Sequence, residues 1–127
     1  MRCDQEDGLG MFEWLLGKRR NTAGSMSKSN NIAPTDVLSL LQTGAKVTIL
    51  DVREQQEFRA GHIKGAQLIP LGQLAKRTHE IRDDRPVITV CRSGNRSAQA
   101  ARLLRSKGFE VQNMTGGMNQ WPGKVAK

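Results

Sequence analysis

Residues 86–107 read PVITVCRSGNRSAQAARLLRSK, and this stretch decides the fold. Its first part, Pro86–Val90, is short, apolar and β-branched, which predicts a buried strand. Its last part is rich in alanine, carries apolar residues at helical spacing and is followed by Gly108, which together predict a helix. Cys91 therefore ends a strand, and a polar, glycine-containing loop connects it to the N-terminus of a helix.

The surroundings predicted for Cys91 favour negative charge. A helix N-terminus offers unpaired backbone N–H groups and the positive end of the helix dipole. Arg92 and Arg96 add two positive charges to the same loop. We therefore predict that Cys91 is mainly a thiolate at neutral pH and acts as a nucleophile on an anionic substrate. The alternative, an inert cysteine buried at a strand end, is disfavoured by the two arginines.

The length of the loop distinguishes two kinds of cysteine chemistry. Four residues separate Cys91 from Arg96, one fewer than in cysteine loops that wrap around a phosphate. A smaller ring suits a sulfur atom carried on the cysteine better than it suits a tetrahedral phosphate. The spacing thus favours sulfur chemistry.

Other motifs accompany the loop in a fixed order. They are Asp51-Val52-Arg53-Glu54, Glu57-Phe58, Gly61-His62-Ile63-Lys64-Gly65-Ala66, Ile69-Pro70, Gly108-Phe109, Gly116-Gly117 and Trp121. With the cysteine loop, this pattern resembles a single-domain rhodanese, a domain of the thiosulfate sulfurtransferase type. The resemblance covers about residues 32–123.

The resemblance implies a three-layer α/β fold, in which a central, mostly parallel five-stranded sheet has helices on both faces. It also implies a persulfide cycle, in which Cys91 takes the outer sulfur of a small anionic donor such as thiosulfate and releases sulfite. The sulfur then passes to cyanide, to a thiol or to a sulfur-acceptor protein. No metal or organic cofactor is implied.

We expect the loop itself to bind the substrate, through Arg92, Ser93, Gly94, Asn95, Arg96 and Ser97. Its amides would hydrogen-bond the persulfide anion, and a glycine lets the backbone curl toward the ligand. The two arginines would attract and orient a dianionic donor. Ser93 offers a hydroxyl donor. For Ser97 we favour the simpler role of capping the following helix.

Asp51 ends another predicted strand, at the same edge of the sheet as Cys91. Two roles are open to it. It can act as an acid or base beside Cys91, or it can pair with Arg53 or Arg96 and support the loop, and we favour the pairing. His62 stands in a Gly-His-Ile context that indicates a loop histidine bonded to backbone rather than a partner of Cys91.

The rest of the chain alternates strand and helix patterns, which predicts a parallel sheet with ligands at the carboxyl ends of its strands. We expect strands over residues 47–52, 67–69, 87–90 and 109–113. We expect helical segments over residues 34–42, 53–58, 71–81 and 98–107, with a last short helix leading to Trp121.

Two parts are predicted along the chain, an N-terminal extension over residues 1–30 and the rhodanese domain over residues 31–127. The extension is rich in glycine, serine and charge, and we expect it to be disordered. Its apolar segment, residues 11–16, precedes basic residues instead of following them, which excludes a secretory signal. An amphipathic anchor is possible there, but plain disorder or an untranslated leader is favoured. No apolar run is long enough to span a membrane.

Charge and cysteine content narrow the class of protein further. The net charge is +8, which concentrates anionic donors near the domain. Scattered basic residues and few aromatic ones disfavour nucleic-acid binding. The two cysteines, Cys3 and Cys91, form no CxxC or metal-ligand spacing. A working thiolate suits a reducing compartment, so we expect the protein to be in the cytoplasm. We also expect it to be a monomer.

Two other functions compete with sulfur transfer. One is a cysteine phosphatase or arsenate reductase on a related fold, which the short loop disfavours. The other is a non-catalytic rhodanese-like module used for binding. Such modules usually lack the cysteine, whereas Cys91 stands in a complete loop.

The thiolate is open to a direct test. The rate of alkylation of Cys91 by iodoacetamide, measured against pH, should give an apparent pKa below that of a free cysteine, because the loop stabilises the anion. An apparent pKa of about 8.5 or above would contradict the prediction.

Overall fold

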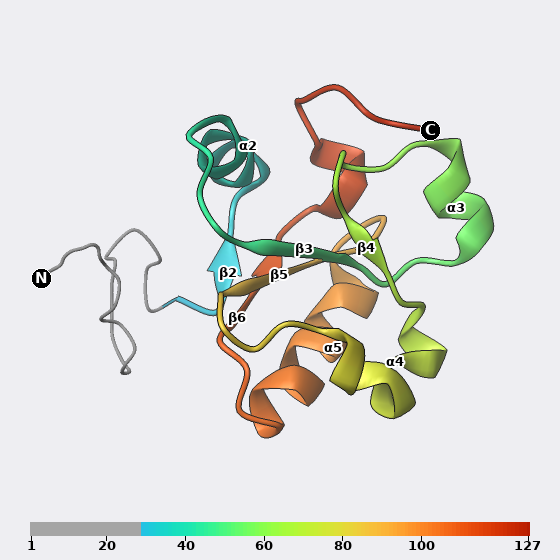
Figure 1. Cartoon of the computed structure of the whole chain (residues 1–127). Coiled ribbons are helices and arrows are strands. Elements are labelled where there is room, and N and C mark those ends of the chain that lie inside the picture. Colours follow the sequence, from blue (N-terminus) through green and yellow to red (C-terminus); the bar gives the residue numbers. More distant parts are fainter. Residues whose placement is uncertain (1–28) are drawn as a thin grey trace, which may run out of the picture.

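The computed structural model describes residues 29–127, and its centre is a five-stranded parallel sheet (Figure 1). The strands are β2 (Asn31–Ile32), β3 (Thr48–Asp51), β4 (Gln67–Leu68), β5 (Val87–Val90) and β6 (Val111–Met114). Their order across the sheet is β2-β6-β5-β3-β4, and every neighbouring pair is parallel. This confirms the α/β class and the five-stranded sheet.

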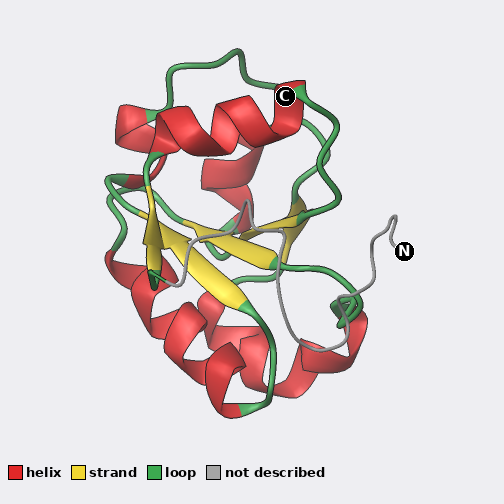
Figure 2. Ribbon diagram, turned by 90° about the vertical axis from the view of Figure 1, so that its left-hand side faces the viewer, coloured by secondary structure: helices red, strands yellow, loops and turns green. Residues whose placement is uncertain are grey.

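Helices cover both faces of the sheet, which gives three layers (Figures 1 and 2). The helical segments are α2 (Pro34–Gln42), α3 (Gln55–Ala60), α4 (Leu71–Arg77), α5 (Asn95–Ser106) and the 3₁₀ turns η1 (Thr78–Glu80) and η2 (Gly117–Gln120). In Figure 1, α4 and α5 lie below the sheet, whereas α2 lies above it. The long crossovers between parallel strands place these helices on the two faces.

The sheet divides the core in two, and β5 contributes to both halves. Ile88 and Val90 pack toward α2 with Val37 and Met114. Val87, and Cys91 directly after the strand, pack on the opposite side with residues of α4 and α5. Successive side chains of a strand point to opposite faces, so a strand covered on both sides is apolar throughout. All four residues of β5 are accordingly buried.

Several features differ from the sequence-based expectation, among them α3 and β6, which both begin two residues later than expected. Strand β2 was not predicted, because two residues are too few to show an alternating pattern, and only pairing with β6 defines it. Helix α5 begins at Asn95, three residues before the expected start. The helix expected over residues 71–81 ends as the 3₁₀ turn η1. The extension expected over residues 1–30 lies, except for its last two residues, outside the described part of the chain.

The carboxyl ends of the strands meet at one edge of the sheet, and there two turns pack backbone to backbone. The amide of Met118 donates to the carbonyl of Cys91 (2.8 Å), and that of Asn119 donates to the carbonyl of Arg92 (2.9 Å). Gly117 makes this approach possible. A Cβ on Gly117 would lie 2.4 Å from the carbonyl oxygen of Cys91, and its φ of 58° favours glycine.

Gly117→Ala should therefore be strongly destabilising, by about 2 kcal/mol or more. The added Cβ would clash with the backbone carbonyls of Cys91 and Arg92, which cannot rotate away. Gly72→Ala is the matched control, since Gly72 lies in α4 and a Cβ added to it would meet nothing within 4 Å. The control should be neutral or stabilising by up to about 1 kcal/mol. Urea unfolding of both variants measures the difference, and equal stability would refute the close approach.

Candidate active site

The sulfur of Cys91 lies inside the loop that connects β5 to α5. The amide of Gly94 donates a hydrogen bond to Sγ at 3.0 Å, and the Oγ of Ser97 lies 3.3 Å from Sγ. Cys91 is 1% exposed, and Ser97 is fully buried. The thiol therefore has hydrogen-bonding partners from the loop and from the first turn of α5.

Two opposing effects set the pKa of the Cys91 thiol. Burial is the larger single effect and raises it. Hydrogen bonds from the Ser97 hydroxyl and from the amides of Ser97, Gly94 and Ser93 lower it, and together they outweigh burial. The pKa lies below its ordinary value, whereas an inert cysteine in apolar surroundings would have a raised one.

The first turn of α5 has no side-chain cap. Gly94 is the N-cap, with a φ of 103° in the left-handed region, and no side chain caps the helix. The capping role expected for Ser97 is therefore wrong. The amide of the N-cap residue Gly94 donates to Sγ, and the amide of Ser97 in the first helical turn also lowers the pKa of the thiol.

Both loop arginines are held by one carboxylate, Glu57 of α3. Arg96 makes a two-pronged ion pair with it, at 2.8 and 2.9 Å. Arg92 approaches the same carboxylate at 3.3 Å, with 63% of its side chain exposed. The arginines expected to orient a donor are thus partly neutralised, and Arg92 is the more accessible of the two.

Glu57 was not predicted as a site residue. Its carboxylate also accepts a hydrogen bond from the amide of Glu54 (3.0 Å), so it completes the capping box of α3. The hydrogen bond from Arg96 is the main cause that lowers the pKa of Glu57 to about 2. The capping-box spacing of Glu54 and Glu57 is visible in the sequence, but a contact across 39 residues is not.

Asp51 forms a buried ion pair with Arg53, which is one of the two partners that the sequence offered. The guanidinium grips both carboxylate oxygens, at 2.8 to 3.1 Å, and also donates to the carbonyl of Gly61 at 2.8 Å. This pair joins the end of β3 to the loop before Ile63. Nδ1 of His62 hydrogen-bonds the backbone carbonyl of Phe58 (2.7 Å), and the His62 ring stacks on the Phe58 ring. The prediction of a loop histidine bonded to backbone is thus confirmed.

The remaining loop residues, Ser93 and Asn95, are exposed. Ser93 affects the sulfur through its amide, and Asn95 is the first residue of α5. Asn113 of β6 was not predicted as a site residue. Its side chain hydrogen-bonds the Ser97 hydroxyl and the carbonyl of Gly94, and no motif in the sequence signals these contacts.

Other features of the described residues carry no comparable chemistry. Residues 29–127 contain no group of three or more potential metal-ligating side chains from His, Cys, Asp and Glu. Over the same residues, no helix has both the length and the apolar character needed to cross a bilayer.

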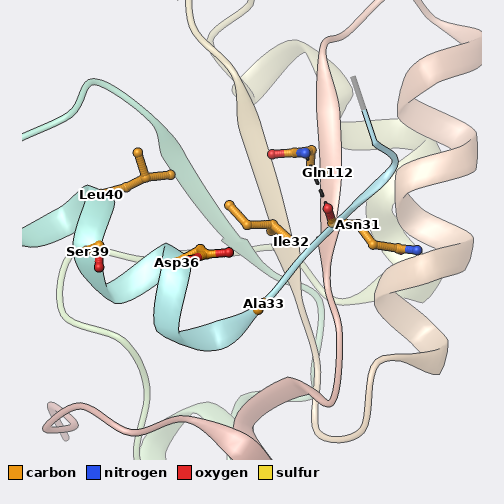
Figure 3. Close-up of a pocket in the computed structure, with 7 residues that line it drawn as sticks. All are labelled: Asn31, Ile32, Ala33, Asp36, Ser39, Leu40 and Gln112. Carbon is orange, nitrogen blue, oxygen red and sulfur yellow. Dashed lines mark hydrogen bonds between the residues drawn. The ribbon is translucent and has the colours of Figure 1, made fainter. Parts of the chain in front are cut away.

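A separate hollow of about 420 Å³ lies between β2, α2 and β6 (Figure 3). It is lined by Asn31, Ile32, Ala33, Asp36, Ser39, Leu40 and Gln112. Its one charged wall residue is the acidic Asp36, so the hollow is unsuited to an anion.

The fold and site define a class: a parallel α/β domain with a buried cysteine whose sulfur accepts backbone hydrogen bonds in a loop at the carboxyl edge of its sheet. The family model of the rhodanese-like domain matches residues 33–124, and the chain belongs to this family. It is 48% identical over 81 residues to YqhL, an uncharacterized protein of Bacillus subtilis, and the match covers 63% of this chain and 64% of YqhL. The chain thus spans less than two thirds of the length of that relative.

Two further relatives extend the comparison. The thiosulfate sulfurtransferase GlpE of Pseudomonas fluorescens is 37% identical over 97 residues, which cover 76% of this chain and 87% of GlpE. The crystal structure of a rhodanese-related protein from Thermoplasma volcanium superposes with a TM-score of 0.71 at 28% identity, over 77% of this chain and 98% of that one. Sulfurtransferases are therefore among the relatives of this chain.

The Glu57 ion pairs predict a pH-dependent stability. The pKa of Glu57 is about 2 in the folded protein and 4.5 ordinarily, so its contribution is complete above about pH 4.5 and is lost as the pH falls toward 2. Wild type should exceed Glu57→Gln in urea midpoint at pH 7, and the gap should narrow steadily between pH 4.5 and 2. Asp83→Asn, which removes an exposed carboxylate, is the control. A difference in urea midpoint that stays constant with pH would contradict a stabilising role for the Glu57 ion pairs.

Proposed function

We propose that this protein is a sulfurtransferase that moves a sulfane sulfur from thiosulfate, or a similar small anionic donor, through a persulfide on Cys91. The observation that carries the proposal is the hydrogen bond from the Gly94 amide to Sγ, at 3.0 Å. The carbonyls of Cys91 and Arg92 are held by η2, so the loop offers its amides to the sulfur. Preorganised donors of this kind stabilise charge on a sulfur anion.

The reaction proceeds in two balanced displacements. The Cys91 thiolate attacks the outer sulfur of thiosulfate, a new S–S bond forms, and sulfite leaves with the electron pair of the bond that breaks. Cyanide, or a thiolate of an acceptor, then attacks the outer sulfur of the persulfide. The sulfur leaves with the acceptor, and the Cys91 thiolate is restored. No metal or redox cofactor enters either step.

The charges around the loop support a small inorganic donor. Arg92 is largely exposed and shares Glu57 with Arg96, so it remains able to contact an incoming anion. The burial of Cys91 favours a donor that is small enough to enter the loop. A thiol or sulfur-acceptor protein is the natural second substrate, and we place the reaction in a reducing compartment such as the cytoplasm.

A phosphatase or arsenate reductase reaction is less well supported. The ring between Cys91 and Arg96 is small, and both arginines already share a carboxylate. Hydrolysis of an aryl phosphate by the folded protein would favour that alternative.

The proposal is tested by intact mass after incubation with thiosulfate. The Cys3→Ser variant leaves Cys91 as the one cysteine of the chain. It should gain about 32 Da, the mass of one sulfur atom, and lose it again when cyanide is added.

Cys91→Ala should gain no mass, and Cys91→Ser serves as a second variant that keeps the shape of the side chain. Absence of the gain in the folded Cys3→Ser protein, with thiosulfate and with polysulfide, would refute sulfur transfer. A reactive thiolate without the gain would favour the phosphatase or the binding module.

A further inference from the structure

The hydroxyl of Ser97 lies between two groups that can accept its proton. On one side, Oγ is 3.3 Å from the sulfur of Cys91. On the other side, it hydrogen-bonds Oδ1 of Asn113. Ser97 is fully buried and Asn113 is 6% exposed, so water has little access to any of these atoms. One hydroxyl proton must serve two acceptors whenever the sulfur is negatively charged.

The orientation of the Asn113 amide is set by its other partner. Its Nδ2 donates to the carbonyl of Gly94 at 3.2 Å, and a carbonyl can only accept. Oδ1 therefore faces Ser97 as a pure acceptor. The main chain of Asn113 is held in β6, where its amide donates to the carbonyl of Asn30. The side chain thus presents a fixed acceptor to the hydroxyl.

Two arrangements of the protons follow from this geometry. When Cys91 is a thiol, its S–H donates to Oγ of Ser97, and the Ser97 O–H donates to Oδ1 of Asn113. When the thiol proton leaves to solvent, the Ser97 hydroxyl keeps its own proton and turns it toward the sulfur anion. Oδ1 of Asn113 then loses its donor in a buried site, which costs free energy. Ser97 and Asn113 thus act on the sulfur in opposite directions.

We propose that Asn113 is a positioning residue that competes with the Cys91 sulfur for the single proton of Ser97 and thereby tunes the charge on the nucleophile. The proposal deepens the sulfurtransferase function and rests on it for its role in catalysis. Because the competition limits how strongly the sulfur anion is stabilised, the same sulfur can serve two functions. It is a nucleophile in the first displacement and a leaving group in the second, and a sulfur anion stabilised too strongly would be a weak nucleophile.

The charged side chains near the sulfur form ion pairs with one another. Arg92 and Arg96 share Glu57, which reaches the loop from α3. Asp51 and Arg53 pair with each other at the end of the neighbouring strand β3. Residues 117–120 of η2 carry no charged side chain. Substitutions at Ser97 and Asn113 leave all of these charges in place.

The test is a titration of Cys91 by thiolate absorbance in the full-length Cys3→Ser protein. Ser97→Ala removes the donor and should move the midpoint up by about one pH unit, since a hydrogen bond to a charged group is lost. Asn113→Val removes the competing acceptor, keeps a residue suited to a strand and should move the midpoint down. The Gly94 carbonyl retains the helical amide of Ala98 in that variant.

The double variant Ser97→Ala/Asn113→Val separates positioning from a general structural effect. Its midpoint should equal that of Ser97→Ala, because Asn113 acts only through the hydroxyl. Asn113→Asp adds a stronger acceptor and a negative charge, so its midpoint should move up, and it should move up by less in Ser97→Ala/Asn113→Asp, where only the charge acts. Circular dichroism establishes that each variant is folded.

The role of Asn113 is overturned if folded Asn113→Val titrates like the parent, or if its effect is equally large without the Ser97 hydroxyl. If Asn113→Val does not fold, Asn113→Asp is compared with Ser97→Ala/Asn113→Asp, and an upward shift of equal size with and without the Ser97 hydroxyl overturns the role. Persulfide loading is measured separately. If the Cys3→Ser parent does not form a persulfide but the variants show the predicted midpoints, the sulfurtransferase function is refuted and the proton competition is still supported.

Discussion

The site depends on the hydrogen bonds from η2 to the carbonyls of Cys91 and Arg92. A loop that surrounds an anion needs its amides inside and its carbonyls outside. The amides of Met118 and Asn119 provide the outer partners, so the carbonyls are satisfied and directed away from the sulfur. The approach is so close that only a glycine fits at position 117. The chemistry of residue 91 is therefore fixed by a turn that follows the last strand.

The sequence predicted the parts of the fold that local patterns determine. The bounds of β5 and α2 match the expected ones, because an apolar β-branched run and a proline at a helix start are local signals. The Asp51–Arg53 pair was also within reach, since its members are two residues apart. Features that arise from distant pairing were not predicted. They are strand β2, the Glu57 contact with Arg96, and Asn113 beside Ser97.

The start of α5 shows how a functional site can override a local preference. A serine near a helix start is usually a cap, and this preference placed Ser97 at the terminus. In the structure, the helix begins at Asn95, three residues before the expected start, and the Gly94 amide donates to the sulfur. The serine side chain is thereby released to contact Cys91 from within the first turn. Departures from local rules are expected at functional sites.

The charged side chains beside the Cys91 loop form ion pairs with one another. Arg96 of α5 forms an ion pair with Glu57 of α3 at 2.8 Å. This ion pair links the two helices, and the arginine also adds positive potential near the loop. The donors that lower the pKa of the Cys91 thiol are neutral, the amides and one hydroxyl, and the charge of the sulfur also acts on Arg96. Neutral donors lower the cost of burying the anion without forming a tight ion pair with it. In the proposed reaction the sulfur accepts and then releases an atom, which requires this intermediate stabilisation, because either extreme would stop one of the two displacements.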